Sequence, residues 1–387
     1  MKSKSGVVII SLLAFILGVI AAFAAISYVK LPLTEDVVVA ETTYYTKSGE
    51  TRHSDVNLSD AAISFHFLEL GNKYTGDCTY IKTDTCDILI DCGSKSNSVS
   101  VVKDYLNEFI TDGTLEYVII THAHQDHYAG FATTEKVDSI FDLYKCENII
   151  TFSRTNQKDT SATYKNYTRE LKDEVAAGAK HYTALDCVNG ENGATQDFNV
   201  GTGVNMRILD SFYYRTDDVH KSKTENDYSV CTLFTYTPEN GSEKNALFTG
   251  DLEEKGEEYL VSLNDLPEVD LYKAGHHGSK TSSTETLLSA IKPKTVCVCC
   301  CAGSPEYTKT AANQFPTQTF INNVSKYTDD LYITTLCLNY DSDEYTSFNG
   351  NIVYLCNKLG KTNVICSNND TKLKDSEWFK NNRTLPA

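Results

Sequence analysis

Short apolar runs and amphipathic stretches alternate along the chain from about residue 60 onward. Apolar and polar side chains alternate over residues 63–67, which predicts a half-buried strand that continues into Leu68. Residues 87–91 and 116–120 contain continuous apolar runs, which are typical of strands inside a sheet. Similar runs predict later strands at 246–249, 269–272 and 296–298.

Apolar side chains at helical spacing separate several of these strands. One such stripe extends from Val102 to Phe109, and Gly113 is a suitable stop for the helix. A second stripe extends from Tyr164 to Val175, and we interpret both stripes as surfaces that face the core. Further helices are expected at 284–291 and 317–327, and residues 351–367 predict a hairpin that turns near Gly360.

Strands and helices interleave over the whole body without an internal repeat. This order favours one domain over residues 59–370, followed by a C-terminal tail at 371–387. The expected fold class is α/β (α+β), an αββα sandwich in which helices cover two packed, mixed sheets. Residues 155–200 are rich in polar side chains and are predicted to form an insertion beside the functional site.

The N-terminal end differs from the body. Residues 1–29 begin with two lysines and continue as a charge-free, almost wholly apolar run. A signal-anchor helix fits, because a membrane span needs roughly 20 apolar residues. A cleaved signal peptide fits equally, because residues 22–24 form an A-x-A-like site. Both place the body outside the membrane, anchored or secreted, with a soluble cytoplasmic enzyme as the remaining alternative. Residues 30–58 are mostly polar and are predicted to be a linker.

The amino-acid composition limits the kinds of partner that the protein is expected to bind. A hydrophobic fraction of 41% over 387 residues suffices for a buried core. The formal net charge of −17 repels phosphate backbones, although bound metal cations would reverse the field locally. The 13 cysteines form no two Cys-x-x-Cys units, which argues against a structural zinc knuckle. Several lie in apolar runs, where we interpret them as small core residues, and one or two disulfides stay open.

The clearest chemical signal is the segment from Thr121 to His127, directly after the apolar strand at 116–120. Three imidazoles and a carboxylate within six residues are ligands that zinc and similar divalent ions bind. Because so short a span leaves little slack to surround one ion, we expect two metals. His122 and His124 would bind one of them, and Asp126 and His127 the other. The alternative is a polar loop that is rich in histidine by chance.

Two further strand ends complete the predicted site. Asp251 follows a strand and a glycine, a position suited to a carboxylate that bridges two metals, with a helix N-cap as the alternative. His276 and His277 follow another strand between glycines that let the backbone approach closely. One of them is expected to bind the second metal and the other to serve the substrate or act as an acid. Asp126 and His277 are the candidate catalytic groups.

Asp91 is the candidate for orienting a metal ligand through a hydrogen bond. It ends the strand at 87–91, and a simple turn carboxylate is the alternative interpretation. His53, His181 and His220 have no comparable surroundings. His66 lies on the polar side of its strand, and we interpret it as structural or exposed.

Together these segments resemble the metallo-β-lactamase superfamily. Within it they are similar to the extracellular hydrolase domain of ComEC-type competence (DNA-uptake) proteins and to related phosphodiesterases. The resemblance spans roughly residues 60–370, and its matching segments occur in the expected order: His66 to Gly71, Gly76 to Cys78, Ile88 to Gly93, the His-x-His-x-Asp-His motif, Glu225 to Val230, Leu247 to Glu253 and Gly275 to Thr281. The histidine motif is the specific part. The resemblance implies the αββα fold and a metal-dependent hydrolase.

Two departures from this family pattern stand out. The superfamily often supplies another metal-binding histidine between the first motif and the bridging aspartate. Here only His181 and His220 are available, and Asn226 or Asp227 is the substitute to consider. The uptake-channel domains also usually carry Gly-His before the proline where this chain has Gln314-Phe315, which puts a shared substrate in doubt. The many membrane helices of a full uptake channel are absent from the sequence given.

The sequence as a whole predicts a two-metal hydrolase that faces outward from the membrane. Zinc is the first expectation for both metals and manganese is the alternative. Such ions activate water and polarise the scissile ester. The expected substrate is a small-molecule or cell-envelope phosphoester. The alternatives are an extracellular DNA nuclease, an amide or thioester hydrolase of the same fold, and a non-catalytic binding module.

Overall fold

The computed structural model describes residues 42–45, 51–54, 60–71, 76–158, 161–239 and 241–386. The chain divides into two units, Met1–Glu41 and Thr42–Ala387, and all described residues belong to the second. The predicted signal segment at 1–29 lies outside the described residues. Among those described, no helix combines the length and the apolar character that crossing a bilayer requires.

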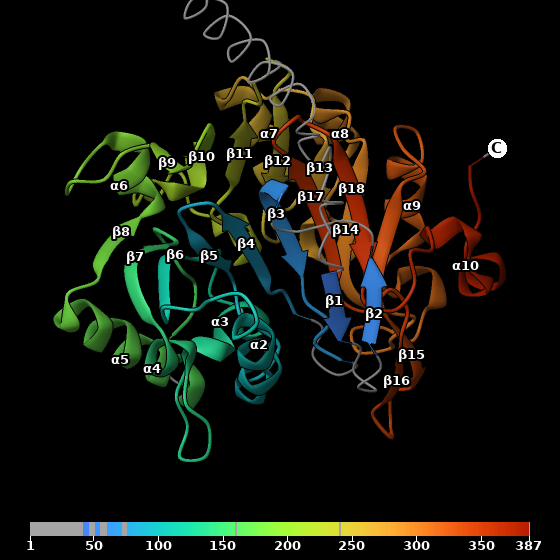
Figure 1. The fold of residues 1–387 in the computed structure, drawn as a ribbon, viewed down its shortest axis with the longest axis horizontal. Coiled ribbons are helices and arrows are strands. Elements are labelled where there is room, and N and C mark those ends of the chain that lie inside the picture. Colours follow the sequence, from blue (N-terminus) through green and yellow to red (C-terminus); the bar gives the residue numbers. More distant parts are fainter. Residues whose placement is uncertain are drawn as a thin grey trace, which may run out of the picture. The chain divides into compact units, whose positions relative to one another are not determined.

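The described strands form a two-stranded hairpin and two eight-stranded sheets. The first large sheet has the order β18-β17-β3-β4-β5-β6-β7-β8, with β5 to β8 parallel (Figure 1). Its strands are β3 (Ala61–Phe67), β4 (Thr79–Thr83), β5 (Asp87–Ile90), β6 (Thr114–Ile120), β7 (Lys145–Thr151), β8 (Lys180–Thr183), β17 (Ile352–Asn357) and β18 (Thr362–Cys366).

The second large sheet has the order β16-β15-β14-β13-β12-β11-β10-β9, with β12 to β15 parallel. Its strands are β9 (Asp197–Gly201), β10 (Val204–Ile208), β11 (Thr232–Tyr236), β12 (Lys244–Phe248), β13 (Leu271–Lys273), β14 (Thr295–Ala302), β15 (Leu331–Asn339) and β16 (Glu344–Ser347).

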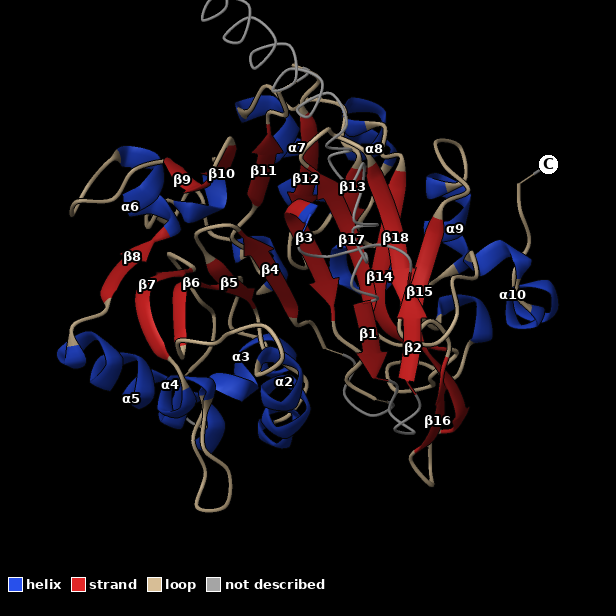
Figure 2. Cartoon of the chain, viewed as in Figure 1, coloured by secondary structure: helices blue, strands red, loops and turns tan. Residues whose placement is uncertain are grey.

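Helices cover the outer faces of both sheets, as Figure 2 shows for the layer below β4 to β8. The first sheet is covered by α2 (Val99–Leu106), α3 (Gln125–Tyr128), α4 (Ile140–Leu143) and α5 (Ala162–Ala177), and α6 (Ala184–Asn189) follows β8. The second is covered by α7 (Glu254–Leu263), α8 (Glu285–Ile291), α9 (Gln318–Val324) and α10 (Glu377–Asn382). The αββα sandwich expected from the sequence is therefore confirmed.

The core between the sheets is built from the inward-facing side chains of both. Phe65 on β3 stacks on Phe248 of β12 with ring centroids 5.6 Å apart, and it meets Phe234 of β11 edge-on at the same distance. Each of these rings is at most 2% exposed. Fully burying such a side chain stabilises the fold by about 1.5–3 kcal/mol, so this contact joins the two sheets strongly.

Most expected elements are present, with corrections at their ends and faces. The stripe from Val102 is helical only to Leu106, and α9 ends at Val324 rather than near residue 327. The expectation that β3 is half-buried was wrong, since Ser64 and His66 are 4% and 0% exposed. The cause is α2, whose Tyr105 hydroxyl lies 2.7 Å from His66 Nδ1 and closes that face.

Two terminal segments carry structure beyond what the sequence pattern suggested. Within the expected linker, β1 (Thr42–Tyr45) and β2 (Thr51–Ser54) pair as an antiparallel hairpin. In the expected C-terminal tail, Phe379 of α10 packs into the core of the second sheet's helical layer. Arg383 donates hydrogen bonds from Nε to the Pro316 carbonyl at 2.9 Å and from Nη2 to the Gln314 carbonyl at 2.7 Å.

Candidate metal centre

The candidate site lies where parallel strands of the two sheets end. The Thr121 carbonyl after β6 accepts a hydrogen bond from the Val230 backbone N–H before β11 at 2.9 Å, so the strand ends of both sheets meet there. The loops after β6, β12 and β13 carry the histidine motif, Asp251 and the His276-His277 pair. All seven candidate metal ligands are thereby gathered in one place.

Asp251 is the centre of this group. Its Oδ2 atom lies 3.2 Å from His127 Nε2 and 3.4 Å from His277 Nε2. The Nε2 atoms of His122 and His276 are each 4.0 Å away from the same oxygen. A carboxylate and imidazole nitrogens are groups that zinc and similar divalent ions bind. The alternative of a helix N-cap was wrong, because α7 begins at Glu254 with Glu253 as its N-cap.

The remaining motif residues flank Asp251 on two sides. His122 Nε2 lies 3.0 Å from His124 Nδ1, so these two side chains converge on one point. Asp126 Oδ2 lies 3.5 Å from His277 Nε2 on the other side. His277 thus lies beside Asp126, and the assignment of these side chains to two metals stays a prediction.

Hydrogen bonds at Nδ1 fix the orientation of the His127 and His277 rings. Asp91 Oδ2 lies 2.8 Å from His127 Nδ1, and Asp91 also accepts bonds from the Thr121 backbone N–H at 2.8 Å and hydroxyl at 2.7 Å. His277 Nδ1 lies 3.1 Å from the Cys299 carbonyl, which can only accept, so Nδ1 carries the proton. Both rings therefore direct Nε2 toward Asp251, the orientation that metal binding needs.

The two histidines after β13 have different surroundings. His277 is 1% exposed, whereas the side chain of His276 is 23% exposed at the edge of the site. His276 Nδ1 lies 3.2 Å from the Thr281 hydroxyl and 3.4 Å from Asn226 Nδ2. The backbone φ angles of 45° and 52° place both histidines in the left-handed region, which is strained for these residues.

Asp77 joins the cluster, although the sequence analysis placed it only in the family-matching segment Gly76 to Cys78 and gave it no role at the site. Ligand atoms of Asp77, His127, Asp251 and His277 all lie within 4.8 Å of one another. Asp77 approaches both histidines from the Nδ1 side, at 3.3 Å from His277 and 3.9 Å from His127. It also forms an ion pair with Lys273, which is 2% exposed. We therefore interpret Asp77 as an orienting carboxylate, with the ligand side of the cluster at Nε2.

The buried polar atoms fit a divalent cation. Among the described residues, Asp251 Oδ1, His277 Nε2 and Asn226 Oδ1 have no hydrogen-bond partner. Leaving such groups buried and unsatisfied is costly unless a ligand compensates them. Burial would raise the pKa of Asp251, but the neighbouring His127, His277 and His276 outweigh it and hold this pKa well below its usual range. Burial likewise lowers the pKa of His277, while Asp251 and Asp77 raise it to about 10.

Two glycines let neighbouring loops approach the backbone of the motif. A Cβ atom on Gly93 would lie 1.4 Å from the Asp126 carbonyl oxygen, and one on Gly76 would lie 2.5 Å from it. Neither approach is compatible with a side chain. The segments before β4 and after β5 therefore support the short helix α3 that presents Asp126 and His127.

The other histidines considered lie away from the cluster. His181 on β8 is 2.9 Å from the Thr151 hydroxyl, and His220 pairs with Asp217 at 2.8 Å. Asn226 stands beside the site instead: its Nδ2 donates to Glu253 Oε1 at 2.9 Å, and its oxygen is buried. The site thus has the amide of Asn226 where the family pattern suggested a further histidine.

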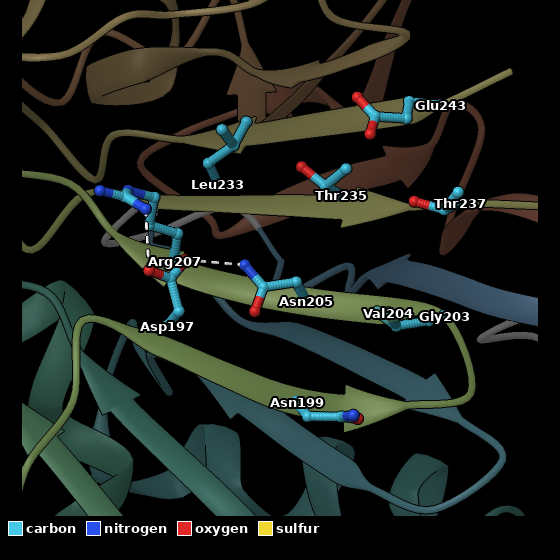
Figure 3. A pocket seen from close by; sticks show the side chains of 10 residues that line it. All are labelled: Asp197, Asn199, Gly203, Val204, Asn205, Arg207, Leu233, Thr235, Thr237 and Glu243. Carbon is cyan, nitrogen blue, oxygen red and sulfur yellow. Dashed lines mark hydrogen bonds and ion pairs between the residues drawn. The ribbon is translucent and has the colours of Figure 1, made fainter. Parts of the chain in front are cut away.

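A separate open pocket of about 510 Å³ lies over β9 to β12 (Figure 3). Asp197 and Arg207 pair across it at 2.8 Å, and Asn205 donates to Asp197 at 2.9 Å. Its ten lining residues include neither histidine nor cysteine. The chemistry suited to metal binding therefore lies at the strand ends and not in this pocket.

Residues 71–175, which include the histidine motif, match the sequence model of the metallo-β-lactamase superfamily. Two curated proteins are similar to this chain. Recombination protein 2 of Haemophilus influenzae is 27% identical over 220 residues, which is 56% of this chain and 22% of that protein. ComE operon protein 3 of Bacillus subtilis is 24% identical over 184 residues, 48% of this chain and 20% of that one. The chain thus spans about a fifth of the length of these relatives.

Solved structures of this fold are similar at lower identity. The metallo-β-lactamase fold protein YhfI from Bacillus subtilis is 12% identical, with a TM-score of 0.38, and the match covers 71% of this chain and 96% of that one. An isothiocyanate hydrolase from Delia radicum gut bacteria is 13% identical, with a TM-score of 0.36, and the match covers 73% and 99% of the two chains.

Proposed function

We propose that this protein is a phosphoester hydrolase that uses two divalent metal ions. The observation that carries the proposal is the convergence of four histidine Nε2 atoms within 4.0 Å of Asp251 Oδ2. Four imidazole nitrogens around one buried carboxylate serve a metal better than they serve packing. The superfamily match supports a metal-dependent hydrolase as the class of protein.

The side chains present would divide between two metals. The first ion would be held by His122 and His124. The second ion would be held by Asp126, His127 and His277, and Asp251 would bind both ions. Zinc suits the imidazole-rich set, and manganese is the alternative. Bound ions of this kind lower the pKa of a water toward neutrality and polarise the phosphoryl oxygen.

The protein's own contribution is orientation and selection. Asp91 and the Cys299 carbonyl hold His127 and His277 with Nε2 toward the reacting position. The half-open position of His276 at the edge of the site suits contact with the substrate. Burial of Asp251 and His277 excludes bulk water from their surroundings, which strengthens the electrostatic interactions on which the reaction depends.

We propose a small-molecule or cell-envelope phosphoester as the substrate. A net charge of −17 opposes a duplex, because duplex binding usually requires a basic face that contacts several phosphates. The similarity to Recombination protein 2 and ComE operon protein 3 favours a second candidate, an extracellular nuclease. We also propose that the N-terminal segment anchors the protein to a membrane.

The test combines metal analysis with a substrate panel. Protein purified without chelator should contain close to two divalent ions per chain. With zinc or manganese it should hydrolyse bis-aryl phosphodiesters or choline phosphoesters faster than DNA. His122→Ala should abolish this activity, whereas His181→Ala, outside the cluster, should retain it. Absence of metal after such purification would overturn the proposal. Efficient, salt-sensitive DNA cleavage that is lost in His122→Ala would establish the nuclease instead.

A further inference from the structure

Two aromatic rings border the metal centre on the segment between β14 and α9. The Tyr307 side chain is 58% exposed, and its ring centroid lies 5.3 Å from that of Phe315. The Phe315 ring in turn lies 5.8 Å from the His276 ring and 5.9 Å from the His277 ring. The aromatic surface therefore extends continuously from the cluster to solvent.

The hydroxyl group of Tyr307 fixes the position of this surface relative to the reacting position. It donates toward Asp126 Oδ2 at 3.5 Å, and Asp126 is itself 3.5 Å from His277 Nε2. A phosphoryl group held at the cluster would therefore place its attached group beside the Tyr307 ring. An exposed tyrosine in that position offers a flat apolar face to whatever the phosphate carries.

We propose that Tyr307 and Phe315 form a stacking platform for a planar ring attached to the scissile phosphoester. The inference rests on the proposed function and deepens it by naming the substrate class: a small phosphoester that bears an aromatic ring, such as a nucleoside phosphate. Aromatic side chains stack on any base through its π-face, so the platform selects planarity and not a particular base. The charge of −17 is compatible with one nucleotide and opposes a long polyanion.

Substitution of Tyr307 tests the platform with less disturbance of the metal site than substitution of Phe315. Phe315 contacts both imidazoles of the His276-His277 pair, so its removal would also disturb the metal site. Tyr307 is mostly exposed, and its hydroxyl makes the hydrogen bond to Asp126 of the cluster. Tyr307→Ala removes the platform, whereas Tyr307→Phe keeps the ring and removes the hydroxyl.

The experiment compares two ligands that share a phosphate monoester and differ in the attached group. Thymidine 5′-monophosphate carries a planar base, and methyl phosphate carries none. Calorimetric titration of the zinc-loaded full chain should show about tenfold tighter binding of the nucleotide, since stacking a base contributes roughly a factor of ten or more. Tyr307→Ala should abolish this preference without changing methyl phosphate affinity, and Tyr307→Phe should retain it. Leu359→Ala, a remote exposed apolar residue, is the matched control.

Equal affinities of the wild-type protein for the two ligands would overturn the platform. So would a preference for thymidine 5′-monophosphate that survives Tyr307→Ala, or an equal loss of both affinities in that variant. Hydrolysis of methyl p-nitrophenyl phosphate by the same preparation tests the proposed function separately. If that ester is not hydrolysed while the nucleotide preference depends on Tyr307, phosphoester hydrolysis fails and the binding platform stands.

Discussion

The loop after β6 and the loops after β12 and β13 bring metal-binding side chains to the same place by different routes. The first loop holds four of them within six residues, so chain connectivity alone keeps them close. The later loops hold Asp251 and His277, which are distant in sequence. They meet because β12 and β13 are parallel and Phe248 is paired with Lys273. Asp251 stands three residues beyond one partner and His277 four residues beyond the other.

The two routes also differ in backbone strain. In the first loop His124 is extended at φ −88° and leads into a regular helical turn. After β13, His276 and His277 both adopt left-handed angles, which cost of order 1–3 kcal/mol each. Surrounding structure must hold such angles in place. The first half of the site is therefore defined locally, whereas the second half depends on the completed fold.

The largest effect should come from removing the residue that both halves share. We expect Asp251→Ala to lower kcat by roughly a thousandfold or more, because the carboxylate is proposed to hold both metals and the reacting water needs both. Metal content should fall in the same variant. Asp197→Ala, in the open pocket over β9 to β12, is the control and should leave both unchanged. Normal activity and metal content in Asp251→Ala would remove this residue from the site.

The next largest effect is a loss of stability on removing the buried ion pair between Lys273 and Asp77, which links the two halves of the site. Lys273 and Asp77 are 2% and 1% exposed, so Lys273→Met leaves a buried carboxylate without its partner. We expect the free energy of unfolding of this variant to drop by about 3–5 kcal/mol in urea titrations. Adding Asp77→Asn should recover part of it.

A surface pair is the matched control for this prediction. Lys292 and Glu268 lie 2.8 Å apart with side chains 57% and 60% exposed, and Lys292→Met should leave stability nearly unchanged because solvent screens the pair. A loss as small in Lys273→Met as in Lys292→Met would show that the buried pair does not connect the two halves energetically.

A smaller effect separates how the two halves orient their histidines. Asp91→Asn should weaken metal affinity about 10–100-fold, the usual consequence of losing an orienting carboxylate. Asp91 has a φ of 57°, a region that asparagine tolerates, so the backbone should be preserved. His277 uses the Cys299 carbonyl for the same task, which side-chain substitution leaves in place. Cys299→Ser should therefore retain metal affinity. If Cys299→Ser weakened metal affinity as much as Asp91→Asn does, the two halves would not differ in how they orient their histidines.

The difference between the halves also explains what the sequence could predict. The motif from His122 to His127, the hairpin near Gly360 and the inner strands follow from local patterns, and the structure contains these elements. Asp77 could not be found in this way, because its role depends on Lys273, which lies in the other sheet. The burial of His66 was missed for a similar reason, since α2 covers a face that its own strand pattern marks as polar. The different surroundings of His276 and His277 could not be predicted either, because they depend on the left-handed turn after β13.

The last prediction concerns an acid sensitivity in the first sheet, away from the candidate metal centre. His66 is fully buried, with Nδ1 2.7 Å from the Tyr105 hydroxyl and Nε2 2.8 Å from the Ser64 hydroxyl. Burial, with a smaller contribution from Lys82, lowers the pKa of His66 to about 3. In the unfolded chain the ring binds its proton near pH 6.5, so stability is lost as pH falls from about 6.5 toward 3. The slope attributable to His66 is at most about 1.4 kcal/mol per pH unit. Urea unfolding of chelator-treated protein at pH 7, 6, 5 and 4 should therefore show a shallower decline for His66→Gln than for the wild type. His220→Gln, a partly exposed histidine paired with Asp217, should follow the wild-type curve. Parallel curves for His66→Gln and the wild type would mean that His66 does not stay neutral in the fold and that the acid sensitivity lies elsewhere.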